Sequence, residues 1–171
     1  MTRWALALLM VFAGCGAETP DAPDVPGQNR ETTEATFGEP ITLTGNQEGL
    51  EVKVTPTEFI DPLKGGEFDK PQGESRFVGV ELLLENTGDT TYNGAPSTGA
   101  QLILRNDEQA DTRHLTGGRC GRSFASGLHL AEGDRRRGCV AFEVPGGVGA
   151  RSFQFNLESG AGPTTGVWQR R

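Results

Sequence analysis

Residues 77–84 read FVGVELLL, and this stretch decides the fold class. If it is extended, one face carries only apolar side chains: Val78, Val80, Leu82 and Leu84. The intervening positions, from Phe77 to Leu83, include Glu81 and would lie on the opposite face, because side chains alternate along a strand. The strong turn signal Asn86-Thr87-Gly88-Asp89 follows directly. The stretch therefore predicts a β-strand with one fully apolar face.

The same period of two recurs along the rest of the chain. Apolar residues alternate in three further segments: 50–54 (LEVKV), 140–144 (VAFEV) and 153–157 (FQFNL). Shorter strands are expected over 41–43, 101–105 and 128–130 and around 167–168. No segment shows a convincing helical period. About seven to nine short strands separated by turns predict an all-β fold, an antiparallel β-sandwich.

Composition and charge limit the class of protein. The chain has 171 residues, which suffices for one domain and a tail, and 25 of them are glycine. The formal net charge is −7, and the acidic residues are concentrated in the first part of the chain. Nucleic-acid binding needs a concentrated basic surface, so we expect no nucleic-acid partner.

The first fourteen residues have the features of an export signal. Arg3 precedes the apolar run Trp4–Phe12, which as a helix would measure about 14 Å and is too short to span a bilayer. The following Phe12-Ala13-Gly14-Cys15 resembles the bacterial lipoprotein signal. That resemblance implies a signal peptide at 1–14 that is cleaved before Cys15, and a diacylglycerol on the Cys15 thiol. The alternatives are a plain secretory signal and an N-terminus that stays uncleaved.

Residues 15–35 are expected to form the lipidated N-terminus and a flexible linker. The segment is rich in proline and acidic residues and has almost no large apolar group except Val25. Such a composition buries too little surface to offset the entropy of ordering. The folded domain is then expected at 36–171, on the extracytoplasmic face of the cell membrane.

Four stretches together resemble a known family: Asp61-Pro62, Phe77 through Asp89, Leu128 through Asp134, and Gly138 through Pro145. The set is similar to a domain of unknown function found in lipoproteins of actinobacteria and related Gram-positive bacteria. That family is similar in fold to secreted mycobacterial immunoprotective antigens. The resemblance covers about residues 36–160 and implies an immunoglobulin-like sandwich on a lipid tether. It implies no catalytic residues and leaves any ligand unstated.

Two cysteines remain after Cys15, and an exported chain with an even remainder predicts a Cys120–Cys139 disulfide. The alternative is a metal site built from His114, His129 and these cysteines, but the spacings are wider than zinc sites usually show. A calcium loop at Asp61, Glu67 and Asp69 matches no known spacing. We therefore expect no metal and no cofactor.

Arginines provide the candidate partner-binding residues. Five of them lie in the long segment from Asn106 to Gly138, which we expect to be mainly loop: Arg119, Arg122, Arg135, Arg136 and Arg137. Long loops on a rigid sandwich often carry recognition. A solvated turn with no partner is the alternative for the Arg135–Arg137 run.

The leading hypothesis is a non-enzymatic surface lipoprotein that binds an extracytoplasmic protein or an anionic polymer. A metal-dependent or enzymatic envelope factor is the first alternative, and a purely structural envelope protein is the second. The phenylalanines mostly occupy alternating positions typical of the core, and exposed tryptophan or tyrosine for sugar stacking is scarce. No Gly-x-Ser-x-Gly motif is present. The scarcity of such aromatic residues weakens a carbohydrate-binding interpretation, and the lack of a catalytic motif favours a binding role over catalysis.

Overall fold

Short strands account for most of the described chain. The computed structural model describes residues 30–121, 124 and 127–170. Its strands are β1 (Glu31–Thr36), β2 (Ile41–Thr44), β3 (Glu51–Leu63), β4 (Arg76–Asn86), β5 (Tyr92–Gly94), β6 (Ala100–Leu104), β7 (Gln109–Arg113), β8 (Leu128–Leu130), β9 (Arg135–Val144), β10 (Ala150–Asn156) and β11 (Thr164–Gln169). Two short helical turns, α1 (Pro96–Gly99) and η1 (Glu158–Gly160), complete the elements.

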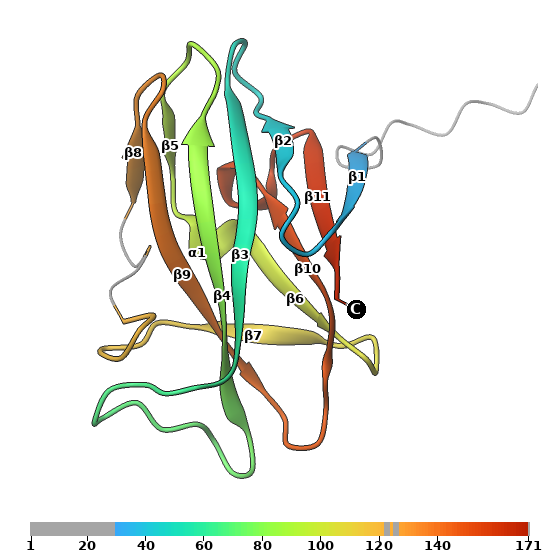
Figure 1. Ribbon diagram of the computed structural model, residues 1–171, viewed down its shortest axis with the longest axis vertical. Coiled ribbons are helices and arrows are strands. Elements are labelled where there is room, and N and C mark those ends of the chain that lie inside the picture. The colour runs from blue at the N-terminus through green and yellow to red at the C-terminus, as the bar shows by residue number, and fades with distance from the viewer. Residues whose placement is uncertain (1–29, 122–123, 125–126, 171) are drawn as a thin grey trace, which may run out of the picture.

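The strands form two layers that share one crossing strand. The pairing order is β1-β11-β10-β6-β7-β9-β4-β3-β2, and β5 pairs separately with β8. The first half of β7 pairs with β6, whereas its second half, Asp111 to Arg113, pairs with β9. Figure 1 shows β2, β3, β4 and β9 in one layer and β6, β10 and β11 in the other, with β7 running across the lower end. The expected all-β sandwich is therefore confirmed.

The core lies between the two layers and follows the predicted alternation. Val78, Val80, Leu82 and Leu84 of β4 are all at most 1% exposed. The ring of Phe142 on β9 meets that of Phe153 on β10 edge-on, 6.4 Å apart between centroids, which joins the layers. Trp168 is fully buried, and its indole nitrogen donates to the carbonyl of Glu39 at 2.7 Å.

The chain has more strands than the sequence predicts, and the folded domain begins earlier. Residues 31–35, which we expected in the flexible linker, belong to β1. This strand pairs in parallel with β11, from Glu31 opposite Thr164 to Thr36 opposite Gln169. Its sequence, ETTEAT, has no apolar alternation. The strand is instead held by backbone hydrogen bonds to β11, which lies far away in the sequence.

The segment from Asn106 to Gly138 is also more ordered than expected. Besides the expected β8 it contains β7 and the start of β9, which the sequence did not predict, whereas most of its other described residues lie in turns and loops as expected. Arg135, Arg136 and Arg137 are strand residues that pair with positions 83–85 of β4. The turn reading of this run is wrong, because backbone pairing with β4 continues through these charged residues.

A second, smaller apolar cluster lies on the outer face of the β3-β4-β9 layer. Its buried members are Leu63, Phe77, Leu115, Cys120, Cys139 and Ala141. The expected disulfide joins Cys120 to Cys139, with 4.9 Å between their Cα atoms. The bond passes over β4 at Gly79, where an added Cβ would come within 2.9 Å of the sulfur of Cys120.

The predicted signal peptide at 1–14, Cys15 and the first part of the predicted linker lie outside the described residues. Within the described part of the chain, no helix is long and apolar enough to cross a membrane.

The glycine under the disulfide gives the first prediction. Gly79→Ala places a methyl group against both sulfurs, so we expect the variant to lose about 1–3 kcal/mol of unfolding free energy in urea titrations. In a background carrying Cys120→Ala and Cys139→Ala, the same substitution should cost much less, because the obstructing sulfurs are gone.

Gly127→Ala is the matched control, since the nearest atom to its added Cβ is 4.0 Å away. We expect this control to leave stability unchanged or slightly raised. An equal cost for Gly79→Ala with and without the disulfide would contradict the close packing described here.

Candidate functional site

Two glycine-containing loops meet on the outer face of the β3-β4-β9 layer. One is the β3–β4 loop, residues 64–75, and the other is the disulfide-bound segment 114–121 that follows β7. A backbone bridge joins Gly65 to Gly118. An added Cβ at Gly66 would come within 2.9 Å of the Cα of Gly117. The loops approach this closely because neither has a side chain at the contact.

Asp69 connects the two loops through its carboxylate. It accepts hydrogen bonds from the amide of Gly66 at 2.7 Å and, across the interface, from the amide of Thr116 at 2.9 Å and that of Gly117 at 3.1 Å. The Thr116 hydroxyl donates a further bond at 3.0 Å. These donors, led by the Thr116 amide, hold the pKa of Asp69 below its ordinary value. The charge therefore stays on Asp69 at neutral pH and fixes the loops together.

A recess of about 270 Å³ opens beside this junction. Apolar groups line part of it: Phe77 and Leu115, which are buried, and Phe68, whose residue is 83% exposed. The lining also includes the basic and titratable groups Lys70, Arg113 and His114. The recess thus combines an apolar wall with hydrogen-bond donors, a combination typical of small-ligand sites.

Glu143 of β9 also lines the recess, and both of its carboxylate oxygens already accept hydrogen bonds. Its side chain is only 9% exposed, and its oxygens accept from the amide of Gln72 and from Nε of Arg113, the latter at 2.7 Å. Burial alone would raise the pKa of Glu143, but these two donors outweigh it and hold the pKa low. A second hollow of about 170 Å³ lies on the other side of this bridge and shares Gln72, Arg113 and Glu143 with the recess.

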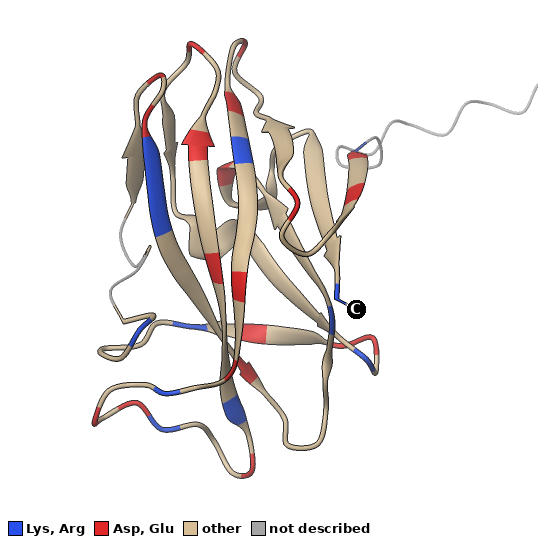
Figure 2. Cartoon of the chain, in the orientation of Figure 1, with Lys and Arg blue, Asp and Glu red and all other residues tan. Residues whose placement is uncertain are grey.

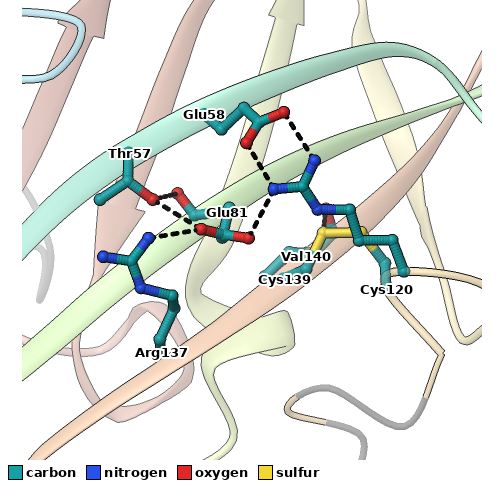
Figure 3. Close-up of polar contacts among 8 residues, drawn as sticks. Thr57, Glu58, Glu81, Cys120, Arg137, Cys139 and Val140 are labelled. Atoms are coloured by element: carbon teal, nitrogen blue, oxygen red, sulfur yellow. Dashed lines mark hydrogen bonds and ion pairs between the residues drawn. A yellow bond between two sulfur atoms is a disulfide. The ribbon is translucent and has the colours of Figure 1, made fainter.

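The structure places two of the predicted arginines in an internal ion-pair network. Arg119 binds Glu58 at 2.5 Å and Glu81 at 3.1 Å, and Arg137 binds Glu81 at 2.7 Å. Figure 3 shows Glu81 beside Thr57 and Arg137, next to the disulfide. The carboxylate of Glu81 is 13% exposed and also accepts from the Thr57 hydroxyl at 3.1 Å. Arg119 and Arg137 therefore compensate acidic residues of β3 and β4.

The remaining predicted arginines do not join this network. Arg135 and Arg136 are exposed at the start of β9, where Figure 2 shows a basic run on an otherwise mainly acidic layer. Arg122 lies outside the described residues. Since β7 pairs only with residues 141–143 of β9, the start of β9 is paired on its β4 side alone, and charged side chains on such an open edge discourage pairing with other chains.

The residues of the two alternative metal sites do not come together. Cys120 and Cys139 are oxidised, so neither thiol can ionise to bind zinc or attack a substrate. His129 lies on β8 and contacts Asn93, whereas His114 lies at the recess. Asp61 of the suggested calcium loop binds Arg76 at 2.6 Å. Within residues 30–121, 124 and 127–170, no group of three or more His, Cys, Asp or Glu side chains is placed to hold a metal ion.

Sequence reasoning missed the recess itself. Its walls come from β3–β4 loop residues and from β7–β9 residues that lie more than forty positions apart. The available signals were the doublets Gly65-Gly66 and Gly117-Gly118, and a lone phenylalanine, Phe68, within a polar loop. We expected the phenylalanines to be mostly core, and Phe68 is the exposed exception.

The fold defines a β-sandwich with one disulfide, and the loops 64–75 and 114–121 cover part of one outer face. The chain belongs to the DUF4352 family, a domain of unknown function, which matches residues 44–164. A comparison with curated proteins finds no match.

Solved structures share the fold. The secreted protein MPT63 from Mycobacterium tuberculosis is 13% identical with a TM-score of 0.56, and the match covers 81% of this chain and 97% of MPT63. YjhA from Bacillus subtilis is 14% identical with a TM-score of 0.55, covering 82% and 99%. A predicted lipoprotein, YcdA from Bacillus subtilis, is 15% identical with a TM-score of 0.54, covering 75% of this chain and 38% of YcdA. The expected likeness to a secreted mycobacterial antigen fold is thus confirmed.

The Glu81 network gives a prediction about acid stability. Burial acts to raise the pKa of Glu81, but bonds from Arg137, Thr57 and Arg119 outweigh it and hold the pKa below the ordinary 4.5. Charged Glu81 therefore stabilises the fold above about pH 4.5, and this contribution is lost as pH falls through the lower folded pKa. We expect Glu81→Gln to cost about 1–2 kcal/mol at pH 7, because both arginines lose a charged acceptor but still reach solvent.

Urea unfolding of both proteins from pH 7 to pH 3 measures this, and the difference between them should shrink below pH 4.5. Glu85→Gln is the matched control on the same face of β4, where Lys53 is the ion-pair partner and the side chain of the glutamate is more exposed than that of Glu81. Its effect at pH 7 should be smaller. An effect of Glu81→Gln no larger than that of Glu85→Gln would show that the network adds nothing to stability.

Proposed function

We propose that the mature protein is a lipid-anchored, extracytoplasmic binding module that has no catalytic activity. The observation that carries the binding role is the recess between two loops that the disulfide and Asp69 hold in place. A site whose walls are fixed before binding loses little conformational entropy when a ligand enters. The ligand reaches this site from outside the cytoplasmic membrane.

Location outside the cytosol is supported by three features of the chain. The Phe12-Ala13-Gly14-Cys15 stretch resembles a lipoprotein signal, and the Cys120–Cys139 disulfide suits an oxidising compartment. Structural relatives include one secreted protein and one predicted lipoprotein. A diacylated Cys15 would hold the sandwich at the membrane surface through the linker.

The state of the acidic groups supports binding over catalysis. Asp69 and Glu143 at the recess have lowered pKa values, because their oxygens accept hydrogen bonds from loop amides and, for Glu143, from Arg113. Neither is suited to donate a proton near neutral pH, as a general acid must. The disulfide also removes Cys120 and Cys139 as thiol nucleophiles.

Intact-mass measurement of the native membrane form tests the anchor. We expect cleavage before Cys15, the added mass of a diacylglycerol, and the loss of two hydrogens for the disulfide. Cys15→Ser is the control, and it should abolish both the added mass and retention in the membrane fraction. Native protein that keeps residues 1–14 and washes off membranes would overturn the lipid anchor.

Photo-crosslinking in cells tests the binding role. Replacing Phe68 by a benzophenone amino acid puts a reactive group at the mouth of the recess, and we expect discrete adducts with envelope material. The same replacement at Glu132, an exposed residue of the β8–β9 turn at the opposite end of the sandwich in Figure 1, is the control. Identical patterns at the two positions, or none at Phe68, would count against a binding site here.

A further inference from the structure

The recess offers hydrogen-bond donors to a ligand but few free acceptors. The carboxylate of Asp69 already accepts four bonds, and each oxygen of Glu143 accepts one from a fixed donor. Both acidic groups of the lining are thus occupied by the two loops and Arg113. They offer an incoming ligand little capacity to accept further bonds.

The donors of the recess, in contrast, are unused. Arg113 spends only its Nε on Glu143, which leaves the two terminal nitrogens of its guanidinium. Among the described residues, no acceptor bonds to those nitrogens, to the ammonium of Lys70 or to the ring of His114. Two terminal guanidinium nitrogens form a fork that matches the two oxygens of a carboxylate.

The position of these groups limits the size and polarity of the ligand. Phe77 and Leu115 form an apolar part of the lining, and both belong to the apolar cluster around the disulfide. The exposed ring of Phe68 stands at the mouth. A volume of about 270 Å³ lies just below the usual range for drug-sized ligands, so the space suits one apolar group with a terminal acid.

We propose that the recess binds a small apolar carboxylate, which defines the ligand class of the binding module proposed above. Arg113, Lys70 and His114 hold the carboxylate. The apolar group packs on Phe77 and Leu115, and the ring of Phe68 covers it. A free acid and the C-terminal residue of a peptide both present this chemistry.

Nuclear magnetic resonance titration of the oxidised Cys15→Ser chain with N-acetylphenylalanine is the test. We expect saturable shifts at Leu115, His114 and Lys70, and about tenfold weaker binding of N-acetylphenylalaninamide, which lacks the carboxylate. A peptide that ends in phenylalanine, compared in its acid and amide forms, distinguishes the two sources. Peptide binding at least as tight as that of the free acid assigns the ligand to a chain terminus, and exclusion of the peptide assigns it to a free acid.

The double variant Lys70→Gln, His114→Gln should weaken N-acetylphenylalanine severalfold without changing urea stability, since both side chains are exposed. Lys64→Gln is the matched control, because Lys64 belongs to the same loop and does not line the recess. The inference is overturned if the acid and amide bind equally, if Lys64→Gln has the same effect as the double variant, or if neither probe saturates.

Crosslinks at Phe68 without acid preference would overturn the ligand class and leave the binding module standing. If there are no specific crosslinks at Phe68 and no preference for the acid over the amide, both the binding module and its ligand class are overturned.

Discussion

The disulfide lies across β4 because residue 79 has no side chain, and the outer face of the sandwich depends on that contact. Cys120 is thereby held against Cys139 and over Gly79, and the segment 114–121 is fixed on the sheet. Leu115 is buried in the same cluster and brings His114 to the recess. Asp69 then joins the β3–β4 loop to this segment. A covalent bond, an absent methyl group and one carboxylate therefore fix the two loops that line the recess together with residues of β4, β7 and β9.

The inner and outer faces of the sandwich obey different rules. Between the layers, burial alone explains the residue choice, and the aliphatic residues of β4 and the ring of Phe142 are almost fully inaccessible. On the outer face, apolar residues alternate with Glu81 and its basic partners. An acidic chain that buries carboxylates against a sheet needs cations near them. Arg119 and Arg137 meet that need, so a basic loop that seemed available for a partner is in part engaged internally.

Sequence periodicity predicts those parts of the fold that depend on local alternation. A strand places alternate residues on one face, which predicts two sets of core residues, and all of them are buried: Val78, Val80, Leu82 and Leu84 of β4, and Phe153, Phe155 and Leu157 in and after β10. Cysteine parity predicted the disulfide. In contrast, β1 is polar and is ordered by backbone pairing with β11, more than a hundred residues away. Such pairing leaves no pattern in the strand itself.

The candidate site was less predictable because its geometry is almost wholly non-local. The charge run Arg135–Arg137 suggested a surface turn, but its backbone continues β9 and only its side chains are polar. The pairing of Arg119 with Glu58 joins residues 61 positions apart. The contact of Asp69 with Thr116 spans 47 positions. Spacing along the chain carries no information about such contacts, and only the fold brings them together.

The parallel pairing of β1 with β11 has a mechanical consequence. Any tension that reaches the domain from the preceding chain enters at Glu31, the first residue of β1. A pull directed along that strand loads its hydrogen bonds to β11 side by side, in shear, and does not peel them apart one after another. The edge strand that receives such a load also packs beside the strand of the fully buried Trp168, so force would pass directly into the centre of the sandwich.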